Sequence, residues 1–236
     1  MTEGVQRERE ELLGGEKPAM SKRVIVVANG DPPIDSEMRR WWQPGVRLIA
    51  ADGGARHLLS LGFTPHTVVG DLDSLDIETH EQLIRQGCYL VPHPAEKDET
   101  DLELALLLAV KEDAAEIVVL GALGGRLDQL LANVLLLALP ELMDVTARLV
   151  DNEQEAFVVH GGSQATVEGQ VGDTLSLIPL AGDVSGIYTQ GLKWPLTGDT
   201  LLVGPARGVS NVIVSLPVYV QVEKGTLLVV HRFGGG

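Results

Sequence analysis

Two carboxylates separated by one residue stand in the motif Gly-Asp-Leu-Asp-Ser at residues 70–74, directly after a β-branched run at residues 67–69. A strand that ends in this way places Asp71 and Asp73 on a loop at its carboxyl end, where α/β proteins bind ligands. Carboxylate oxygens are the ligands that Mg²⁺ prefers. The motif therefore predicts a magnesium site, although a solvated turn explains Asp, Gly and Ser equally well when the motif is taken alone.

A second charged motif contains Lys97, Asp98, Thr100 and Asp101 and stands before the apolar run at residues 102–110. Acidic and hydroxyl side chains are ordinary capping residues at the start of a helix, so capping alone is an equal explanation. Lys97 fits that explanation less well, because the positive end of the helix dipole disfavours a cation. The lysine indicates an anionic ligand near this helix start.

Glycines and polar side chains also follow three other predicted strands. Glycines allow the backbone to approach a ligand closely, and a helix that begins after them directs its N-terminus at an anion. An arginine adds a planar group that matches a phosphate. The glycine spacing is neither that of a P-loop nor a complete dinucleotide-binding fingerprint, so it is weak evidence alone. These segments contain Asn29, Asp52 with Gly53, and Gly125 with Arg126 and Asp128.

The elements that must position these residues alternate between strand and helix from residue 24 to about residue 150. This alternation predicts an α/β fold with a Rossmann-like, largely parallel sheet and flanking helices. Because the carboxyl ends of parallel strands meet at one edge, the polar segments must gather there, which predicts a site for magnesium and a nucleotide. The expected strands are 24–28, 47–51, 67–69, 88–91 and 117–120, and the expected helices are 36–42, 55–61, 76–86, 102–110 and one ending at 139.

Beyond residue 151 the pattern changes to short β-rich runs divided by Gly, Pro and Asn, without a helical period. Such runs predict an all-β sandwich, with Lys224 and Gly225 as a hairpin turn between its last two strands. The expected strands are 155–159, 164–167, 174–179, 212–216, 218–223 and 226–231. Three regions follow: a disordered leader at 1–22, an α/β domain that binds magnesium and a nucleotide at 23–151, and a β-sandwich domain at 152–233.

Composition narrows the class of protein. The net charge of −15 and the pI of 4.7 argue against a nucleic-acid-binding protein, which needs a basic surface. The single cysteine, Cys88, excludes an intrachain disulfide and fits the cytoplasm. The leader lacks the apolar core of a secretory signal, and the longest apolar run, 130–139, contains Asn133 and is too short to span a membrane. We expect a soluble cytoplasmic protein.

Six motifs in this order resemble those of the thiamin pyrophosphokinase family. They lie at residues 51–55, 70–74, 97–101, 124–128, 191–196 and 207–211, and the resemblance extends over residues 24–230. It implies that the α/β domain is catalytic and that its nucleotide is ATP, with transfer of diphosphate from ATP to thiamin, giving thiamin diphosphate and AMP. It also implies a homodimer in which the β-sandwich domain binds thiamin near the ATP site of the partner chain.

In such a reaction an alcohol attacks the β-phosphorus of ATP, and magnesium must neutralise most of the phosphate charge in so acidic a protein. We assign the metal-binding and catalytic roles to four carboxylates, one of which accepts the hydroxyl proton. Asp52 is either a metal ligand or a residue that orients the substrate. The four carboxylates are Asp71, Asp73, Asp98 and Asp101.

The nucleotide is expected to contact residues of the glycine-rich and charged motifs. Lys97 and Arg126 would hold phosphates, and Asp128 would meet the nucleotide. Asn29, Gly53, Thr100 and Gly125 complete the expected ATP site.

Three residues of the β-sandwich domain are candidates for binding thiamin. Trp194 is either a core aromatic residue or a ring that stacks on a cationic heterocycle. Ser210 and Asn211 are either turn residues or hydrogen-bonding partners of an aminopyrimidine. The histidines show no metal-ligand spacing, so we expect surface or structural roles for them.

Two positions depart from the family pattern, and two other functions remain open. Leu72 stands where the family usually has Phe, which we expect to alter packing only, and Gln129 stands where a His is usual. A diphosphokinase that acts on a hydroxymethyl pterin would use a similar α/β site. A non-catalytic nucleotide or thiamin sensor would be expected to lack some of the acidic ligands, all of which are present here.

Overall fold

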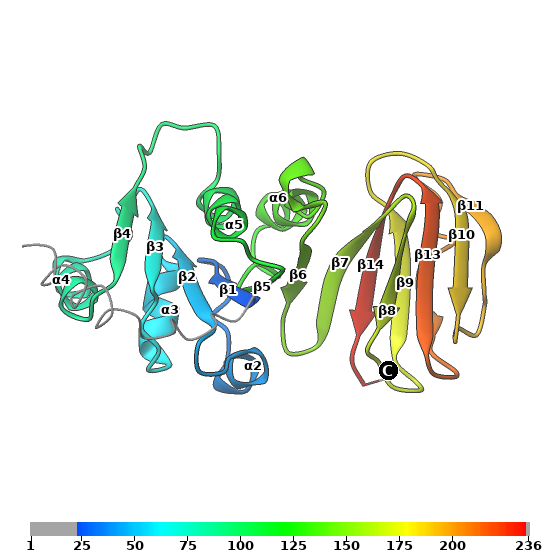
Figure 1. The fold of residues 1–236 in the computed structure, drawn as a ribbon, viewed down its shortest axis with the longest axis horizontal. Coiled ribbons are helices and arrows are strands. Elements are labelled where there is room, and N and C mark those ends of the chain that lie inside the picture. The colour runs from blue at the N-terminus through cyan, green and yellow to red at the C-terminus, as the bar shows by residue number, and fades with distance from the viewer. Residues whose placement is uncertain (1–22, 235–236) are drawn as a thin grey trace, which may run out of the picture.

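The computed structural model describes residues 23–234, and the predicted leader at residues 1–22 lies outside them (Figure 1). Its helices are α2 (Asp35–Trp41), α3 (Gly54–Ser60), α4 (Ile77–Arg85), α5 (Asp101–Lys111), α6 (Leu127–Leu136) and the 3-10 helix η1 (Pro140–Leu142). Its strands are β1 (Arg23–Val27), β2 (Arg47–Ala51), β3 (Thr67–Gly70), β4 (Tyr89–Pro92), β5 (Glu116–Leu120), β6 (Thr146–Val150), β7 (Gln154–His160), β8 (Ser163–Val167), β9 (Thr174–Pro179), β10 (Val184–Gln190), β11 (Thr197–Leu201), β12 (Asn211–Val212), β13 (Val218–Lys224) and β14 (Thr226–Arg232).

The described residues form a mixed α/β structure with one large and one smaller sheet. The large sheet has the strand order β12-β9-β14-β7-β6-β5-β1-β2-β3-β4, and the smaller sheet has the order β11-β10-β13-β8. All pairs from β4 to β6 are parallel, whereas β7 joins β6 in antiparallel register. The parallel part and the first layer of the β-rich part therefore belong to one continuous sheet. The domain boundary at residue 151 stays a prediction.

Helices pack on both faces of the parallel part because its strands are apolar on both faces. The alternating residues Val24 and Val26 pack with Leu102 and Leu106 of α5. Ile25 and Val27 face the other way, into a second cluster with helices α2, α3 and α4, which contribute Met38, Ala55, Leu58 and Leu83. This arrangement fixes the strands firmly, so the loops at their carboxyl ends have a rigid base.

The β-rich part is a pair of facing sheets with its own core (Figure 1). Phe157 and Leu177 of the large sheet are buried with Ile187 and Val220 of the smaller sheet. Two antiparallel layers with an apolar interior are the arrangement predicted for residues 152–233. Residues 152–234 contain no helix.

Some elements differ from the sequence predictions. Strands β6, β10 and β11 were not predicted. Strand β10 contains Gly186 and β11 is largely polar, so neither has a clear alternation of apolar residues. The predicted hairpin at Lys224 and Gly225 is wrong, since β13 pairs with β10 and β8 whereas β14 pairs with β7 and β9. The apolar faces of β13 and β14 point into the same core from opposite layers, so the chain crosses between the sheets at Gly225. Strand β12 is also much shorter than expected.

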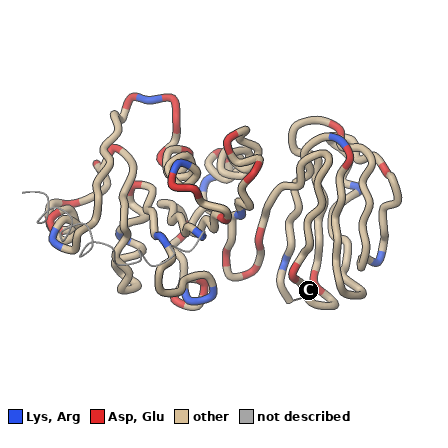
Figure 2. Tube along the Cα trace, viewed as in Figure 1, with Lys and Arg blue, Asp and Glu red and all other residues tan. Residues whose placement is uncertain are grey.

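Charge and helix length bear on the expected partners. Acidic residues occur in both halves of the chain, and basic residues stand singly or in short groups among them (Figure 2). Across the described part of the chain, every helix is too short or too polar to cross a membrane.

Candidate active site

A cavity of about 660 Å³ lies at the carboxyl edge of the parallel strands. It is lined by loops that follow β1, β2, β3 and β5 and by the first residues of α5 and α6, as the alternating pattern predicts. Eight residues predicted from the sequence meet there: Asn29, Asp52, Asp71, Lys97, Thr100, Asp101, Gly125 and Arg126.

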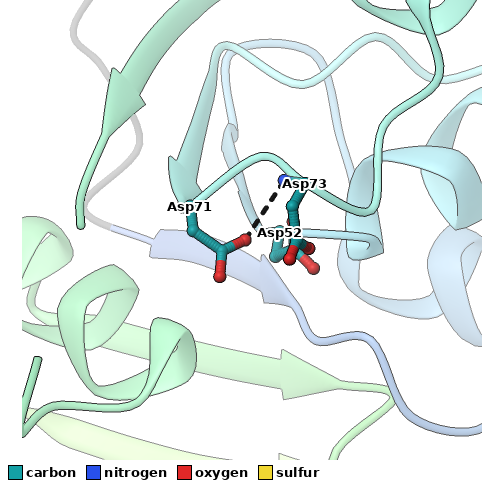
Figure 3. A group of neighbouring side chains, drawn as sticks. All are labelled: Asp52, Asp71 and Asp73. Atoms are coloured by element: carbon teal, nitrogen blue, oxygen red, sulfur yellow. Dashed lines mark hydrogen bonds between the residues drawn. The ribbon is translucent and has the colours of Figure 1, made fainter. Parts of the chain in front are cut away.

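Three carboxylates at this edge form a compact group (Figure 3). Asp52 follows β2, and Asp71 and Asp73 lie on the loop after β3; one oxygen from each lies within 4.8 Å of the others. The backbone N–H of Asp73 donates a hydrogen bond of 3.1 Å to Oδ1 of Asp71, which fixes the loop in a tight turn. The motif at residues 70–74 is thus a turn whose two carboxylates converge with a third from the neighbouring strand.

The electrostatics of this group favour a bound cation. The charge of Asp71 is the largest cause that raises the pKa of Asp73, and the charges of Asp52 and Asp101 act in the same direction. A divalent cation between the carboxylates would remove this repulsion. Three hard oxygen donors within reach of one point fit magnesium or calcium chemistry rather than that of a softer metal.

Asp52 is held in place by neighbours on two loops. Asp52 is only 8% exposed, and its backbone has a left-handed φ of 45°. Its N–H donates a hydrogen bond to the carbonyl of Val69 at 2.8 Å. The hydroxyl of Ser74 donates to Oδ1 of Asp52 at 2.8 Å, and Nδ2 of Asn29 lies 3.5 Å from Oδ2. Sequence reasoning gave Ser74 no role, although it stands in the motif with Asp71 and Asp73.

The second charged motif divides into residues inside and outside the cavity. Asp101 begins α5, and Nζ of Lys97 forms an ion pair of 2.8 Å with it, which raises the pKa of the lysine mainly through this hydrogen bond. Thr100 is the N-cap of α5, since its hydroxyl oxygen accepts from the N–H of Glu103 at 3.1 Å. Asp98 is exposed and belongs neither to the three-carboxylate group nor to the residues around the cavity. Of the four carboxylates assigned to the metal, the group includes Asp71 and Asp73 but neither Asp98 nor Asp101, and its third member is Asp52, for which a ligand role was one of two predictions.

The glycine-rich segment before α6 brings the backbone close to the cavity. Gly124 has a φ of 89°, and a Cβ there would lie 2.1 Å from Oδ2 of Asp31. Gly53 is similarly close to Asn29, with 2.3 Å between a built Cβ and Oδ1. Glycine at positions 53 and 124 leaves room for the polar side chains of Asn29 and Asp31, which a larger residue at either position would displace.

Arg126, which lines the cavity, pairs with Asp128, which does not. Nε of Arg126 lies 3.1 Å from Oδ1 of Asp128, and NH2 lies 2.5 Å from Oδ2. Both side chains are largely exposed, at 74% and 66%. An anion that binds Arg126 must therefore share the guanidinium with Asp128 or displace it.

Several cavity residues were missed at the sequence level. Asp31, Glu99 and Asn133 line the cavity, and Nδ2 of Asn133 donates to the carbonyl of Ala122 at 2.8 Å. Gln129, at the position where the family usually has His, also lines it. Asn133 had a visible signal, because it is a polar residue within an otherwise apolar run.

The three candidates in the β-rich part lie elsewhere. Trp194 is 55% exposed, and Nζ of Lys193 lies 4.7 Å from its ring centroid. The amide of Asn211 is engaged with the backbone of Trp194: Oδ1 accepts from the N–H at 3.1 Å and Nδ2 donates to the carbonyl at 2.7 Å. Ser210 has a φ of 61°, and its N–H donates to Oγ of Ser176 at 3.0 Å. The cavity is lined by residues between Ala28 and Asn133, so these three do not reach it within the described chain.

Two family models match the chain. The model described as "Thiamin pyrophosphokinase, catalytic domain" matches residues 38–147, and the model described as "Thiamin pyrophosphokinase, vitamin B1 binding domain" matches residues 164–227. A curated relative, thiamine pyrophosphokinase of Bacillus subtilis (strain 168), is 26% identical over 210 residues, which cover 89% of this chain and 98% of the relative.

Solved structures of thiamin pyrophosphokinases are also similar to this chain. The crystal structure of thiamine pyrophosphokinase from Bacillus subtilis has a TM-score of 0.80 and 25% identity, with 89% of this chain and 99% of that chain covered. The structure of thiamin pyrophosphokinase from Geobacillus thermodenitrificans has a TM-score of 0.77 and 29% identity, with 90% and 98% covered.

Proposed function

The chain belongs to the thiamin pyrophosphokinase family, and we propose that the cavity beside Asp52, Asp71 and Asp73 is where it carries out the family reaction. The enzyme is a thiamin diphosphokinase that transfers diphosphate from ATP to thiamin. Neither pterin diphosphokinase activity nor a sensor role is favoured by the relatives that match both parts of the chain. The observation that carries the placement is the convergence of three carboxylates in a cavity at the carboxyl edge of the parallel sheet.

Magnesium is the proposed cofactor. Asp52, Asp71 and Asp73 would hold it, with Asp101 near enough to add to the same negative field. When bound, the ion supplies charge neutralisation for the phosphate oxygens of ATP as the β-phosphorus is attacked.

The protein's own residues orient the reactants. Lys97 and Arg126 bind phosphate oxygens, and the N–H groups after Gly124 and Gly125 at the start of α6 add donors with the favourable end of the helix dipole. A carboxylate of the acidic group accepts the proton of the thiamin hydroxyl. The hydroxyl oxygen then bonds to the β-phosphorus, the bond between that phosphorus and the oxygen bridging to the α-phosphate breaks, and AMP leaves.

Two observations support a homodimer as the active form. The cavity within one chain is lined by residues of the α/β part alone. Trp194 belongs to the β-rich part and is exposed to solvent. Helix α6 is mostly apolar yet has no buried residue, and its successive turns expose Leu127 (69%), Leu131 (54%) and Leu135 (56%). A second copy covers this leucine stripe and brings its own Trp194 to the cavity.

Thiamin fits an exposed indole because its thiazolium ring is a cation. In the proposed complex the ring of Trp194 stacks on thiamin, and Asn211 acts through the backbone of Trp194 because its amide is already bonded there. The proposal includes a cytoplasmic location, which the single cysteine supports because it leaves no intrachain disulfide.

Product analysis tests the proposed reaction. Incubation of the protein with ATP, magnesium and thiamin should give AMP and thiamin diphosphate in equal amounts. Formation of ADP with thiamin monophosphate would make the protein a simple kinase. Nucleotide binding without any turnover would make it a sensor.

A further inference from the structure

A histidine lies fully buried between two carboxylates in the β-rich part. His231 on β14 is 0% exposed; its Nδ1 lies 3.2 Å from Oε1 of Glu155 on β7, and its Nε2 lies 2.8 Å from Oδ2 of Asp173 before β9. Both ring nitrogens face acceptors, so both contacts are hydrogen bonds only when the ring carries two protons and a positive charge. Glu155 and Asp173 are themselves buried, at 3% and 5% exposure.

The charged groups near His231 come from β6, β7, the segment before β9 and α2. Glu155 also accepts from NH1 of Arg148 on β6 at 2.6 Å. Asp173 also accepts from the N–H of Gln170 at 2.8 Å and from the N–H of Gly234 at 2.9 Å. On the remaining side, Phe233 and the imidazole are in a T-shaped contact with 5.0 Å between ring centroids, and the guanidinium of Arg40 on α2 lies over the phenyl ring.

Asp173 is bonded through its backbone to the segment that follows β12. The N–H of Ile213 donates to the carbonyl of Asp173 at 2.9 Å, and the N–H of Gly172 donates to the carbonyl of Ile213 at 2.9 Å. The packing is tight on this side as well, because a Cβ at Gly169 would lie 2.6 Å from Cδ1 of Ile213 and 2.9 Å from Nε2 of His231. Asp173 and the imidazole are therefore in direct structural contact with the segment at Ile213.

The segment at Ile213 in turn holds Trp194. Leu192 forms a β-bridge with Ile213, and the N–H of Lys193 donates to the carbonyl of Val212 at 2.9 Å. Two residues before Ile213, the amide of Asn211 binds both the N–H and the carbonyl of Trp194. Hydrogen bonds between three neighbouring segments, and the covalent chain within them, thus connect the buried histidine to the backbone of Trp194.

We infer that Glu155, His231 and Asp173 form a positioning network for Trp194, with His231 as a remote positioning residue for the cationic substrate. The inference rests on the proposed function, in which Trp194 stacks on thiamin. It adds a distinct claim, because a network that only stabilised the fold would leave the affinity for thiamin unchanged in a folded variant. The indole alone reaches the substrate, and His231 acts through the backbone at residues 211–213.

The test compares His231→Gln with the matched control His160→Gln. His160 is a half-buried histidine at the end of β7, and its Nδ1 lies 3.4 Å from Oγ1 of Thr226, outside the path to Trp194. We expect His231→Gln to raise the KM for thiamin about tenfold and to leave the KM for ATP unchanged. Amide hydrogen exchange at residues 191–194 should become faster in the same variant. The control should show neither effect.

Two further variants keep the outcomes distinct. Trp194→Ala reports on the proposed function: if it leaves the KM for thiamin unchanged, Trp194 is not a substrate residue, and hydrogen exchange alone then decides whether the network positions it. If Trp194→Ala raises that KM but folded His231→Gln changes neither KM nor exchange, the inference is wrong. Should His231→Gln fail to fold, Asp173→Asn replaces it, because the amide keeps its size and removes only one charge of the network; the same two outcomes then apply.

Discussion

The hydroxyl of Ser74 donates to Oδ1 of Asp52 at 2.8 Å, so a residue from the loop after β3 orients a buried carboxylate that follows β2. Asp71 and Asp73 stand on the same loop as Ser74. The three carboxylates are therefore coupled mechanically: the turn that presents two of them also fixes the third. This relationship makes Ser74 a positioning residue for the proposed magnesium site.

Replacement of Ser74 by Ala should weaken metal binding without unfolding the protein. The loss of one hydrogen bond corresponds to about 1 kcal/mol, or about a fivefold change in affinity. Titration with Mn²⁺ observed by electron paramagnetic resonance would measure that affinity directly. Ser74→Thr keeps a hydroxyl and should restore most of it; equal affinity in wild type and Ser74→Ala would remove Ser74 from the site.

Substitution of the acidic group should distinguish the structure from the sequence prediction. Asp71→Asn and Asp73→Asn each remove a charge from the converged group and should lower turnover about 100-fold or more. Asp98→Asn is the matched control, because Asp98 is exposed and stands apart from that group. Circular dichroism should show all three variants folded. A loss of turnover in Asp98→Asn as large as in Asp71→Asn would restore the set of ligands predicted from sequence.

The proposed homodimer leads to a complementation experiment. Chains with Asp71→Asn lack a metal ligand, and chains with Trp194→Ala lack the stacking ring, so each variant alone should be nearly inactive. In a mixed dimer one of the two sites has both residues intact, and activity should return toward half of the wild-type value per mixed dimer. If labelled subunits exchange and no activity returns, the site is built within a single chain.

The leucine stripe on α6 should hold the two copies together. Leu131→Glu places a charge on this stripe and should shift the protein toward monomers in sedimentation experiments, with loss of turnover. Ile84→Glu on α4 is the control, because Ile84 and Leu131 are both 54% exposed. Dissociation by the Ile84 variant, or an intact dimer with the Leu131 variant, would place the interface elsewhere.

The stability of the protein should depend on pH through His231. Burial tends to lower the pKa of His231, but its hydrogen bonds to Glu155 and Asp173 outweigh burial and raise the pKa above its ordinary value. A raised pKa in the folded state contributes stability that is fully present below the unfolded value of about 6.5 and is lost as pH rises through the folded value. Urea unfolding at several pH values should show this alkaline loss in wild type and a flatter curve in His231→Gln.

The pKa shifts of Glu155 and Asp173 make stability depend on pH in the opposite direction to that of His231. The partners of Glu155 and Asp173 overcome the burial that would raise their pKa values, and both pKa values are lowered. Their contribution is present above the ordinary carboxylate range and is lost as pH falls through the lowered values. Stability that rises between neutral pH and pH 9 would contradict a protonated His231 in the folded protein.

The sequence predicted the parts of the site that depend on strand order. A parallel sheet brings strand ends to one edge whatever the details of the loops, so the sequence alone places Asp52, Asp71 and Arg126 together. Asp98 could not be separated from Asp101, because only the direction of the loop before α5 decides which carboxylate enters the cavity. Ser74 and Asp31 were missed since their roles depend on side-chain contacts between loops.

The β-rich part was less predictable for physical reasons. Strands β10 and β11 carry glycine, serine and threonine and lack a clear local apolar pattern. Strand β10 pairs with the distant β13, whereas β11, at the edge of the sheet, pairs with β10 alone. Lys224 and Gly225 have the composition of a hairpin turn, but burial of β13 and β14 against each other's layer makes the chain change sheets there. The burial of His231 was likewise invisible, because its acidic partners Glu155 and Asp173 stand 76 and 58 residues away.

The most direct test is a crystal structure of the protein with Mn²⁺, thiamin and an ATP analogue that resists cleavage, measured at a wavelength where manganese scatters anomalously. The anomalous peak should lie within about 2.3 Å of carboxylate oxygens from Asp52, Asp71 and Asp73, beside phosphates held by Lys97 and Arg126. A fully bound analogue with manganese outside this group, or coordinated by Asp98 in its place, would contradict the proposed active site.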